Sequence, residues 1–294
     1  MPPPAGPVLA IDVGGTKLAA GVVMPDGTIV TRRSTPTVAP FDAQELLLSL
    51  VVLAREVGRV ASDEHGVVAE VCGVGCGGPM TAGGEEVSPL NIAAWRGFPL
   101  RARLAAELGL ATFVDNDAKA LALGEGWLGA ARGCDDFIAM VVSTGVGGGI
   151  VLDGRLLDGA QGNAGHIGHV VVEPDGRPCA CGSRGCLEAE ASGTAIEAIT
   201  GRPPADADAA TVARSGRLVG RAVASVAALL DLRLAVVAGS VALGFGEPFF
   251  AAAQRELDAS CRLDFSRGTR IVPGALGANG PLVGAAQVAR SELA

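Results

Sequence analysis

Two segments of this chain, about 130 residues apart, share one order of apolar runs and glycine turns. In the first, Val8–Val13 leads into Gly14-Gly15-Thr16-Lys17, and a second apolar run ends in an Asp-Gly turn. In the second, Phe137–Val142 leads into a glycine loop from Ser143 to Gly148, and another apolar run again ends in Asp-Gly. Such runs are typical of β-hairpins, and their recurrence indicates a duplicated unit. We expect two lobes facing one ligand across a cleft; chance similarity between glycine-rich hairpins is the alternative.

Helical patterns alternate with these strands. Apolar residues recur at helical spacing from Leu46 to Val60, with Asp42 placed as an N-cap and Glu45 in the first turn. A second helical pattern covers Leu100–Leu108, between two short apolar runs. Further along, the pattern predicts a helix over 217–229, a strand over 234–238 and a helix over 282–291. Alternation of this kind predicts a layered α/β protein.

Composition excludes several classes of protein. The chain has 294 residues, a net charge of −8 and only two lysines, Lys17 and Lys119, so no basic stripe is available for a phosphate backbone. Nucleic acid is therefore not an expected partner. We find neither a signal peptide nor an apolar run long enough for a membrane span, and we predict a cytoplasmic protein with no membrane partner.

One loop gathers an imidazole and three thiols. His169, Cys179, Cys181 and Cys186 lie within a turn-rich stretch, 165–188. In structural sites Zn²⁺ takes four tetrahedral ligands from Cys and His, whereas a catalytic zinc keeps one position open. The loop therefore predicts a structural zinc ion. A disulfide is the alternative, although Cys179 and Cys181 are too close in sequence to pair comfortably.

The two glycine loops are candidates for holding phosphates. Backbone N–H groups of Gly14-Gly15-Thr16 can turn toward an anion, and the loop from Thr144 to Gly149 can do the same. Neither is a Walker A loop. The run Gly73–Gly78 matches G-x-G-x-x-G, but Pro79 interrupts the helix that a dinucleotide site requires.

Polar residues follow a predicted buried strand at Asp115-Asn116-Asp117. A carboxylate at a strand end can accept a hydroxyl proton as that oxygen attacks a γ-phosphate, which makes this a candidate general base. Capping of the following helix by Asn116 or Asp115 is the structural alternative.

Five motifs together resemble the ROK family of sugar kinases and repressors, in family order and over nearly the whole chain. They are Asp12-Val13-Gly14-Gly15-Thr16-Lys17, Asn116-Asp117-Ala118, Thr144-Gly145-Val146-Gly147-Gly148-Gly149, the loop from His169 to Glu188, and Val236-Val237-Ala238-Gly239-Ser240. The resemblance implies an actin-like ATPase (ribonuclease H-like) α/β fold with duplicated β-β-β-α topology, usually dimeric. It implies transfer of phosphate from Mg-ATP to the 6-hydroxyl of a hexose. The implied lobes are 1–115, on which a C-terminal helix (281–294) packs back, and 116–280, which carries the zinc loop.

The resemblance also implies residue roles. Asp117 becomes the catalytic base, and His169 uses one ring nitrogen for zinc and turns the other toward the sugar. The implied sugar contacts are Gly78, Asn91, Asn116, Asp117, His166, His169 and Glu188. The implied contacts to ATP and its Mg²⁺ are Asp12, Gly14, Gly15, Thr16, Lys17, Thr144, Gly145, Gly147 and Gly239. For Asn91 a turn role, and for Asp12 capping of its own loop, are the alternatives.

One position departs from the family pattern. Most family kinases have Glu before Ile-Gly-His, where this chain has His166. A carboxylate only accepts hydrogen bonds, while a neutral imidazole donates one and accepts one. The sequence from Ala164 to His169 is similar to that of the bacterial N-acetylmannosamine kinases in the family. We therefore expect N-acetylmannosamine as the hexose or N-acylhexosamine substrate, with glucose or another amino sugar as the alternatives.

Two further classes compete with a kinase. A family repressor carries an added DNA-binding domain, for which the twelve residues up to Asp12 leave no room. A sugar-binding protein without turnover is the other, and the presence of Asp117 and of both glycine loops argues against it.

Overall fold

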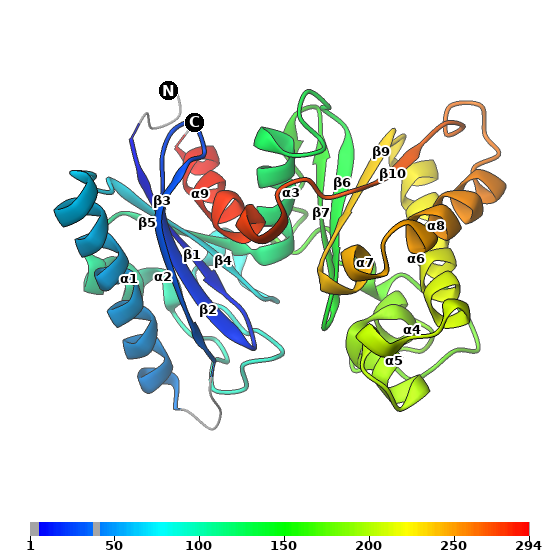
Figure 1. The fold of residues 1–294 in the computed structure, drawn as a ribbon, viewed down its shortest axis with the longest axis horizontal. Coiled ribbons are helices and arrows are strands. Elements are labelled where there is room, and N and C mark those ends of the chain that lie inside the picture. The colour runs from blue at the N-terminus through cyan, green and yellow to red at the C-terminus, as the bar shows by residue number, and fades with distance from the viewer. Residues whose placement is uncertain (1–5, 38–41, 294) are drawn as a thin grey trace. The chain divides into compact units, whose positions relative to one another are not determined.

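The computed structural model describes residues 6–37 and 42–293 of the chain (Figure 1). The first five residues and Ala294, the outer ends of the predicted N-terminal lobe and C-terminal helix, lie outside the described residues. The strands are β1 Val8–Val13, β2 Lys17–Val23, β3 Ile29–Pro36, β4 Val71–Cys76, β5 Thr112–Asn116, β6 Phe137–Val142, β7 Val146–Leu152, β8 Arg155–Leu156, β9 Leu234–Ala238 and β10 Arg270–Pro273. The α-helices are α1 Ala43–His65, α2 Leu100–Leu108, α3 Asp117–Leu128, α4 Leu187–Ala191, α5 Gly193–Thr200, α6 Ala209–Leu230, α7 Ser240–Phe245, α8 Glu247–Ser260 and α9 Gly280–Glu292.

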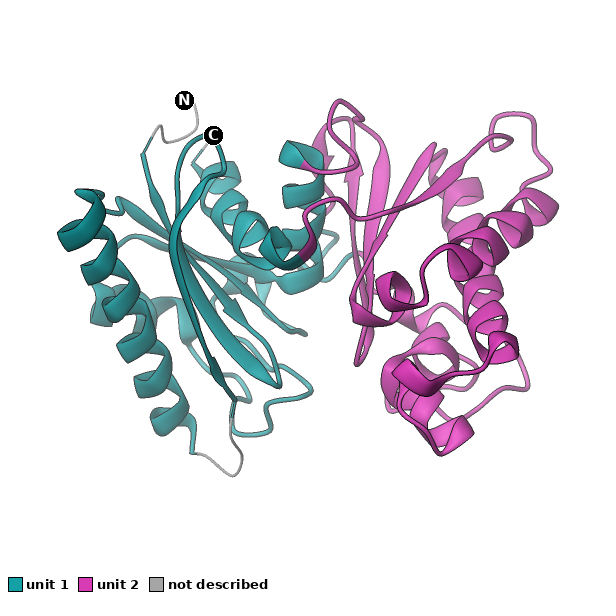
Figure 2. Cartoon of the chain, in the orientation of Figure 1, with its two compact units in different colours: residues 1–128, 158–164, 278–294 teal, residues 129–157, 165–277 magenta. Residues whose placement is uncertain are grey.

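The chain forms two compact units, shown in two colours in Figure 2. Unit 1 comprises residues 1–128, 158–164 and 278–294, and unit 2 comprises 129–157 and 165–277. Unit 1 has a sheet in the order β3-β2-β1-β4-β5, and unit 2 has a sheet in the order β10-β9-β6-β7-β8. Read from the other end, the second order repeats the first, with two antiparallel and two parallel pairings in each. The predicted α/β fold with duplicated topology is confirmed.

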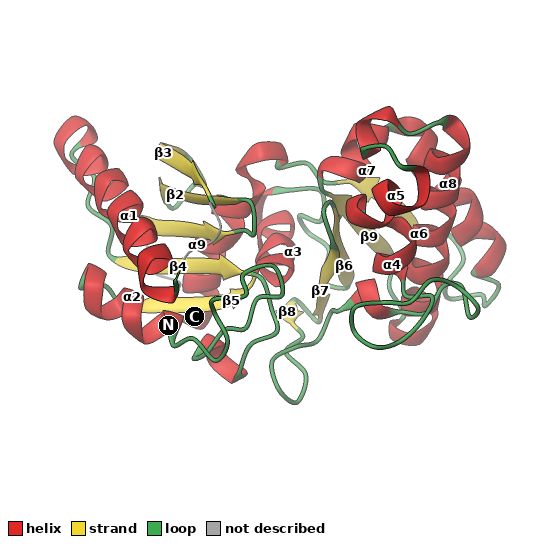
Figure 3. Cartoon of the chain, turned by 90° about the horizontal axis from the view of Figure 1, so that it is seen from below, coloured by secondary structure: helices red, strands yellow, loops and turns green. Residues whose placement is uncertain are grey.

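Helices cover both faces of the first sheet (Figure 3). Alternate residues of β1 separate the two cores: Leu9, Ile11 and Val13 pack with α1 and α2, while Val8 and Ala10 pack with α9. This alternation follows from the two-residue period of a strand. In unit 2, Ile138, Met140 and Val142 of β6 share one core with α6 and α8.

Helix α1 begins where its sequence predicts. The Asp42 carboxylate accepts hydrogen bonds from the backbone N–H groups of Gln44 and Glu45, both at 2.8 Å, and Glu45 reaches back to the Asp42 N–H. This capping box confirms the predicted N-cap. At the other end Gly66 adopts a left-handed φ of 66° and terminates the helix.

The boundary between the units differs from the predicted division at 115/116. Helix α3 belongs to unit 1 because it packs against α9: Gly284 lies so close that a Cβ there would be 2.3 Å from the carbonyl oxygen of Ala120. Residues 158–164, expected in the second lobe, also belong to unit 1. The division therefore follows helix packing and not the strand end.

Unit 2 contains elements that the sequence patterns did not predict. Helix α8 was not anticipated, and α6 begins at Ala209, eight residues before the predicted start at Arg217. Both belong to one contact, because Gly216 and Gly220 of α6 bring its backbone close to that of α8. No helix of the described residues is both long and apolar enough to cross a membrane.

Two helix glycines should respond in opposite ways to alanine. We expect Gly284→Ala to destabilise the protein by about 1–3 kcal/mol, because the new methyl group would overlap the α3 backbone. Gly58→Ala on α1 is the matched control: nothing lies within 4 Å of a Cβ there, so better helix propensity should stabilise the protein by about 0.5–1 kcal/mol. Urea denaturation measures both, and equal stability of the two variants would contradict the packing of α3 on α9.

Candidate active site and metal centre

Three parallel strands of unit 1 end at the same edge of its sheet. Asp12 of β1 pairs in register with Gly75 of β4, which pairs in turn with Asp115 of β5. The loops that follow these strands therefore leave from one edge, the usual ligand-binding edge of a parallel sheet. The strand ends, these loops and the first residues of the elements that follow carry the predicted unit 1 residues Gly14, Gly15, Thr16, Lys17, Gly78, Asn91, Asn116 and Asp117.

Two carboxylates face the end of β4. Gly75 separates them: its register partner is Asp12, and a Cβ at Gly75 would be 3.6 Å from the Cα of Asp117. Burial and, next, the charge of Asp117 raise the pKa of Asp12 to about 7, while Lys17 acts in the opposite direction. Paired carboxylates of this kind can hold a divalent cation or move a proton.

Helix α3 begins at this edge. The N–H of Ala118 donates to Oδ1 of Asn116 at 3.0 Å and to Oδ1 of Asp117 at 2.8 Å. Asn116 thus has the capping role that we gave as the alternative, and this leaves its side-chain NH₂ group for other partners. Asp117 itself is exposed at the start of the helix.

The first glycine hairpin is closed on itself and lies against Asn91. The Gly14 N–H donates to the carbonyl oxygen of Lys17 at 3.0 Å, and the Thr37 hydroxyl donates to the carbonyl oxygen of Gly14 at 2.9 Å. A Cβ at Gly15 would be 2.6 Å from the Cβ of Asn91. The carbonyl oxygen of Gly78 accepts a bond from the N–H of Leu90, so the segments bearing Gly78 and Asn91 are joined to each other.

The second glycine hairpin, between β6 and β7, adjoins the end of β9. The Ser143 and Ser240 hydroxyls are 2.9 Å apart, and Gly239 between β9 and Ser240 has a φ of 100°. A side chain at Gly239 would collide with the Val142 carbonyl oxygen, 2.3 Å from its Cβ, so only glycine fits. The structure thus brings Thr144, Gly145 and Gly147 into one corner of unit 2 with Gly239.

Supporting hydroxyl groups at this corner were missed in the sequence. Ser143, Ser240 and Thr194 are examples, and the Thr194 hydroxyl donates to the carbonyl oxygen of Thr144 at 3.0 Å. The Gly239-Ser240 pair at the start of α7 could have indicated Ser240 from the sequence. Thr194 could not be found in this way, because it lies 50 residues from its partner, Thr144.

Glu188 joins the zinc loop to the second glycine hairpin. It lies in the first turn of α4, and its Oε2 accepts the N–H of Val146 at 2.9 Å. Gly145 packs against the same carboxylate, since a Cβ there would be 2.8 Å from Oε2. A predicted sugar contact is therefore in direct contact with a predicted phosphate loop.

The two histidines of the loop lie near each other. Their rings are 6.1 Å apart between centroids and inclined by 21°, and His166 is exposed. His169 directs Nδ1 toward the Sγ of Cys179, at 3.7 Å. That leaves Nε2 as the nitrogen available on the other side of the ring.

The predicted metal ligands are brought together. The ligand atoms of His169, Cys179, Cys181 and Cys186 all lie within 4.8 Å of one another, and the sulfurs of Cys181 and Cys186 are 3.7 Å apart. Two sulfur ligands of a tetrahedral zinc with bonds of about 2.3 Å are separated by about 3.7 Å, whereas a disulfide bond is about 2.05 Å. The cluster therefore fits a closed four-coordinate metal site. Burial, followed by the neighbouring thiols, raises the pKa of Cys186 to about 12, an effect that a cation would oppose.

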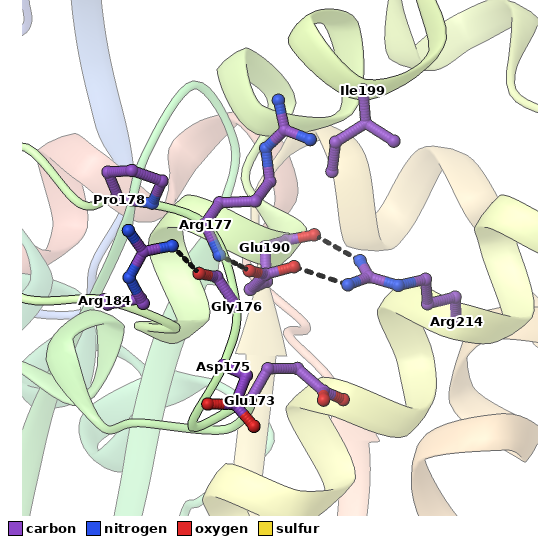
Figure 4. Close-up of a pocket in the computed structure, with 9 residues that line it drawn as sticks. All are labelled: Glu173, Asp175, Gly176, Arg177, Pro178, Arg184, Glu190, Ile199 and Arg214. Atoms are coloured by element: carbon purple, nitrogen blue, oxygen red, sulfur yellow. Dashed lines mark hydrogen bonds and ion pairs between the residues drawn. The ribbon is translucent and has the colours of Figure 1, made fainter.

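Ionic contacts support the outside of this loop (Figure 4). The buried Glu190 carboxylate accepts the N–H of Arg177 and pairs with Arg214, and Arg184 donates to the carbonyl oxygen of Gly176. These residues line a pocket of about 650 Å³. Glu190, the buried charged residue of this pocket, is already paired with Arg214. We therefore interpret the contacts that line the pocket as structural support for the loop.

Comparison with known proteins identifies the chain. Its two sheets with a shared topology define an actin-like ATPase fold. The model of the ROK family matches residues 8–292, and the chain belongs to this family.

Three similar proteins illustrate the relationship. The N-acetylmannosamine kinase of Citrobacter koseri is 39% identical over 257 residues, covering 81% of this chain and 84% of that protein. The glucokinase of Thermotoga maritima is also 39% identical, over 64% of this chain and 58% of that one. Among solved structures, a ROK family glucokinase from Streptomyces griseus in complex with glucose and AMPPNP is 30% identical, with a TM-score of 0.82, covering 97% of this chain and 100% of that one.

Proposed function

We propose that this ROK-family enzyme, an ATP-dependent sugar kinase, phosphorylates the 6-hydroxyl of N-acetylmannosamine with Asp117 as its general base. The observation that carries the proposal is the 39% identity to an N-acetylmannosamine kinase over 81% of the chain. The segment from Ala164 to His169, which carries His166, supports the choice of sugar.

Asp117 is suited to a proton transfer. It is exposed at the start of α3 and lies near Asp12, because its charge is one of the causes that raise the pKa of Asp12. In the proposed step the 6-oxygen bonds to the γ-phosphorus, the bond to the departing ADP oxygen breaks, and Asp117 takes the hydroxyl proton. Asn116, Asn91 and Gly78 hold the sugar from the same edge of the sheet.

The glycine hairpins are assigned to the nucleotide. Gly14, Gly15, Thr16 and Lys17 form the hairpin of unit 1, and Thr144, Gly145 and Gly147 belong to that of unit 2, with Gly239 near the adenosine. The N–H of Gly14 closes its own hairpin, so the backbone N–H groups that follow it are the ones offered to phosphates. Asp12 helps to place the Mg²⁺ shell, and the ion when bound would offset negative charge on the transferring phosphoryl group.

We also propose that the cluster of His169, Cys179, Cys181 and Cys186 holds a structural zinc ion. The sulfur and nitrogen spacings support it, and four protein ligands leave no open position for a water. The ion would fix His169 with Nε2 facing the sugar, and also Glu188, which lies two residues after the last ligand, Cys186.

Glucose is the second candidate substrate, favoured by the identity to a glucokinase. The two sugars differ in whether an acetamido group or a hydroxyl must be accommodated. His166 can donate to an acetamido oxygen, which a glutamate at that position cannot do. On the basis of the family resemblance, we also propose that the protein is a homodimer and that it acts in the cytoplasm.

The purified protein should contain about one zinc ion per chain. Cys181→Ser should lose it together with sugar binding, because three ligands no longer hold His169 and Glu188. Cys134→Ser, which alters a thiol outside the cluster, is the control and should keep the metal. Elemental analysis and sugar-binding calorimetry measure both, and a fully active protein without zinc would refute the assignment.

Asp117→Asn should lower kcat by about 10²-fold or more while the protein stays folded, because the amide keeps the shape of the side chain but cannot take the proton. Asp63→Asn on the exposed face of α1 is the control and should leave kcat unchanged. A coupled ADP-release assay gives the numbers. Near-normal turnover in Asp117→Asn would reassign this residue to capping α3.

N-acetylmannosamine should have a higher kcat/KM than glucose or N-acetylglucosamine. His166→Glu should shift the preference toward glucose by about 1–3 kcal/mol in relative transition-state binding, the worth of one exchanged hydrogen bond to a buried group. His65→Glu makes the same exchange at the end of α1 and should leave the ranking alone. Steady-state kinetics on the three sugars decides: a wild type that prefers glucose rejects the substrate, and an unchanged ranking in His166→Glu rejects the role of His166.

A further inference from the structure

Lys119 is a buried cation whose donors are all used. Its side chain is 3% exposed, and its ammonium lies 2.9 Å from Asp115, 2.7 Å from Asp158 and 3.3 Å from the carbonyl oxygen of Gly162. An ammonium group has three N–H donors, so these three acceptors complete its hydrogen bonding. Desolvating a cation is unfavourable, and it is tolerated here because two carboxylates compensate it.

Two of the three acceptors lie on the segment 158–164, which we call the anchor segment. It is closed by a bond from the Ala164 N–H to the carbonyl oxygen of Asp158, at 2.9 Å. Asn163 adds a reciprocal pair with Met80: the Met80 N–H donates to Oδ1 at 3.2 Å, and Nδ2 donates to the Met80 carbonyl oxygen at 2.9 Å. The segment is thus held to unit 1 by Lys119 at one end and by Asn163 at the other, and His166 follows Asn163 by three residues.

The third acceptor lies on the strand end that carries the proposed base. Asp115 Oδ1, besides contacting Lys119, accepts the N–H of Asn116 at 2.7 Å. Lys119 itself is two residues after Asp117 on α3. One ammonium group therefore joins the turn that presents Asn116 and Asp117 to the anchor segment that leads into His166.

We propose that Lys119, with Asp158, is a positioning residue that holds the anchor segment, and through it His166, in the conformation that receives the sugar. The role in sugar binding rests on the proposed function. Without these contacts the anchor segment would adopt several conformations, and only a fraction of the protein would be competent to bind the sugar. The apparent affinity for the sugar falls by that fraction. The loss affects ground state and transition state equally, so it raises KM for the sugar and leaves kcat unchanged.

Charges around Lys119 indicate how the variants should behave. Burial raises the pKa of Asp115, the charge of Lys119 lowers it, and Asp158 raises it further. Removing Lys119 leaves two carboxylates facing each other, one of them buried, and can disturb folding. Asp158 is the cleaner site to change, because its side chain is 69% exposed and its loss leaves Lys119 paired with Asp115.

The experiment compares Asp158→Ala, Asp158→Asn, Lys119→Met and the double variant Lys119→Met/Asp158→Ala by steady-state kinetics and by amide hydrogen exchange of residues 158–164. We expect Asp158→Ala to raise KM for the sugar by about 5- to 10-fold, with kcat and KM for ATP within about 2-fold of wild type. Asp158→Asn keeps an acceptor and should show a smaller rise. The double variant should have the same KM for the sugar as Lys119→Met, because both changes remove the same contact between Lys119 and Asp158. Arg59→Met, which breaks an exposed i,i+4 pair with Asp63 on α1, is the matched control and should change nothing.

Faster exchange across 158–164 in Asp158→Ala, together with the selective rise in KM, supports the proposal. An unchanged KM for the sugar in Asp158→Ala, unchanged exchange, or additive effects in the double variant would overturn it. If the wild type phosphorylates no hexose, the proposed function fails, and the exchange measurement still decides whether Lys119 and Asp158 hold the segment.

Discussion

The parallel register of β1, β4 and β5 brings three strand ends, and the loops that follow them, to one edge of the first sheet. Because Asp12, Gly75 and Asp115 occupy one row across these strands, Asp12 and Asp117 both adjoin Gly75, which has no side chain to fill the space beside them. Burial and the charge of Asp117 then raise the pKa of Asp12. The second sheet repeats the pairing, and there a glycine after the equivalent strand, Gly239, opens the corner beside the second hairpin.

The features that could be predicted from the sequence are local ones. Strand β1 and helix α2 have their predicted bounds because a short apolar run, or one helical face, specifies them without distant partners. Asp42 and Glu45 form their capping box within four residues. The cluster of candidate metal ligands was predictable for the same reason, since its four residues lie within 18 residues of chain and His with Cys at such spacing is typical of a metal site.

What could not be predicted depends on contacts between distant residues. The assignment of α3 to unit 1 is decided by Gly284, more than 160 residues away from Ala120, and α8 is recognised as a core helix through its contact with Gly216 and Gly220 of α6. The bond from Val146 to Glu188 spans 42 residues, and that from Lys119 to Asp158 spans 39. The i,i+4 spacing of Asp115 and Lys119 was visible in the sequence, but nothing there indicated a second carboxylate on the same ammonium.

His166 lies in the chain between two segments that are held by polar contacts of other residues. A residue at this position can therefore differ from the family pattern without loss of the fold. On its N-terminal side the anchor segment is held by Lys119 and Asn163, and on its C-terminal side the metal cluster begins at His169. The exposed His166 ring is inclined by 21° to that of His169. A change at position 166 therefore exchanges one polar group on a frame that other residues hold in place. In the proposed function its effect would fall on which hydrogen-bonding groups of the sugar are paired, because specificity depends on which polar groups a site leaves unpaired.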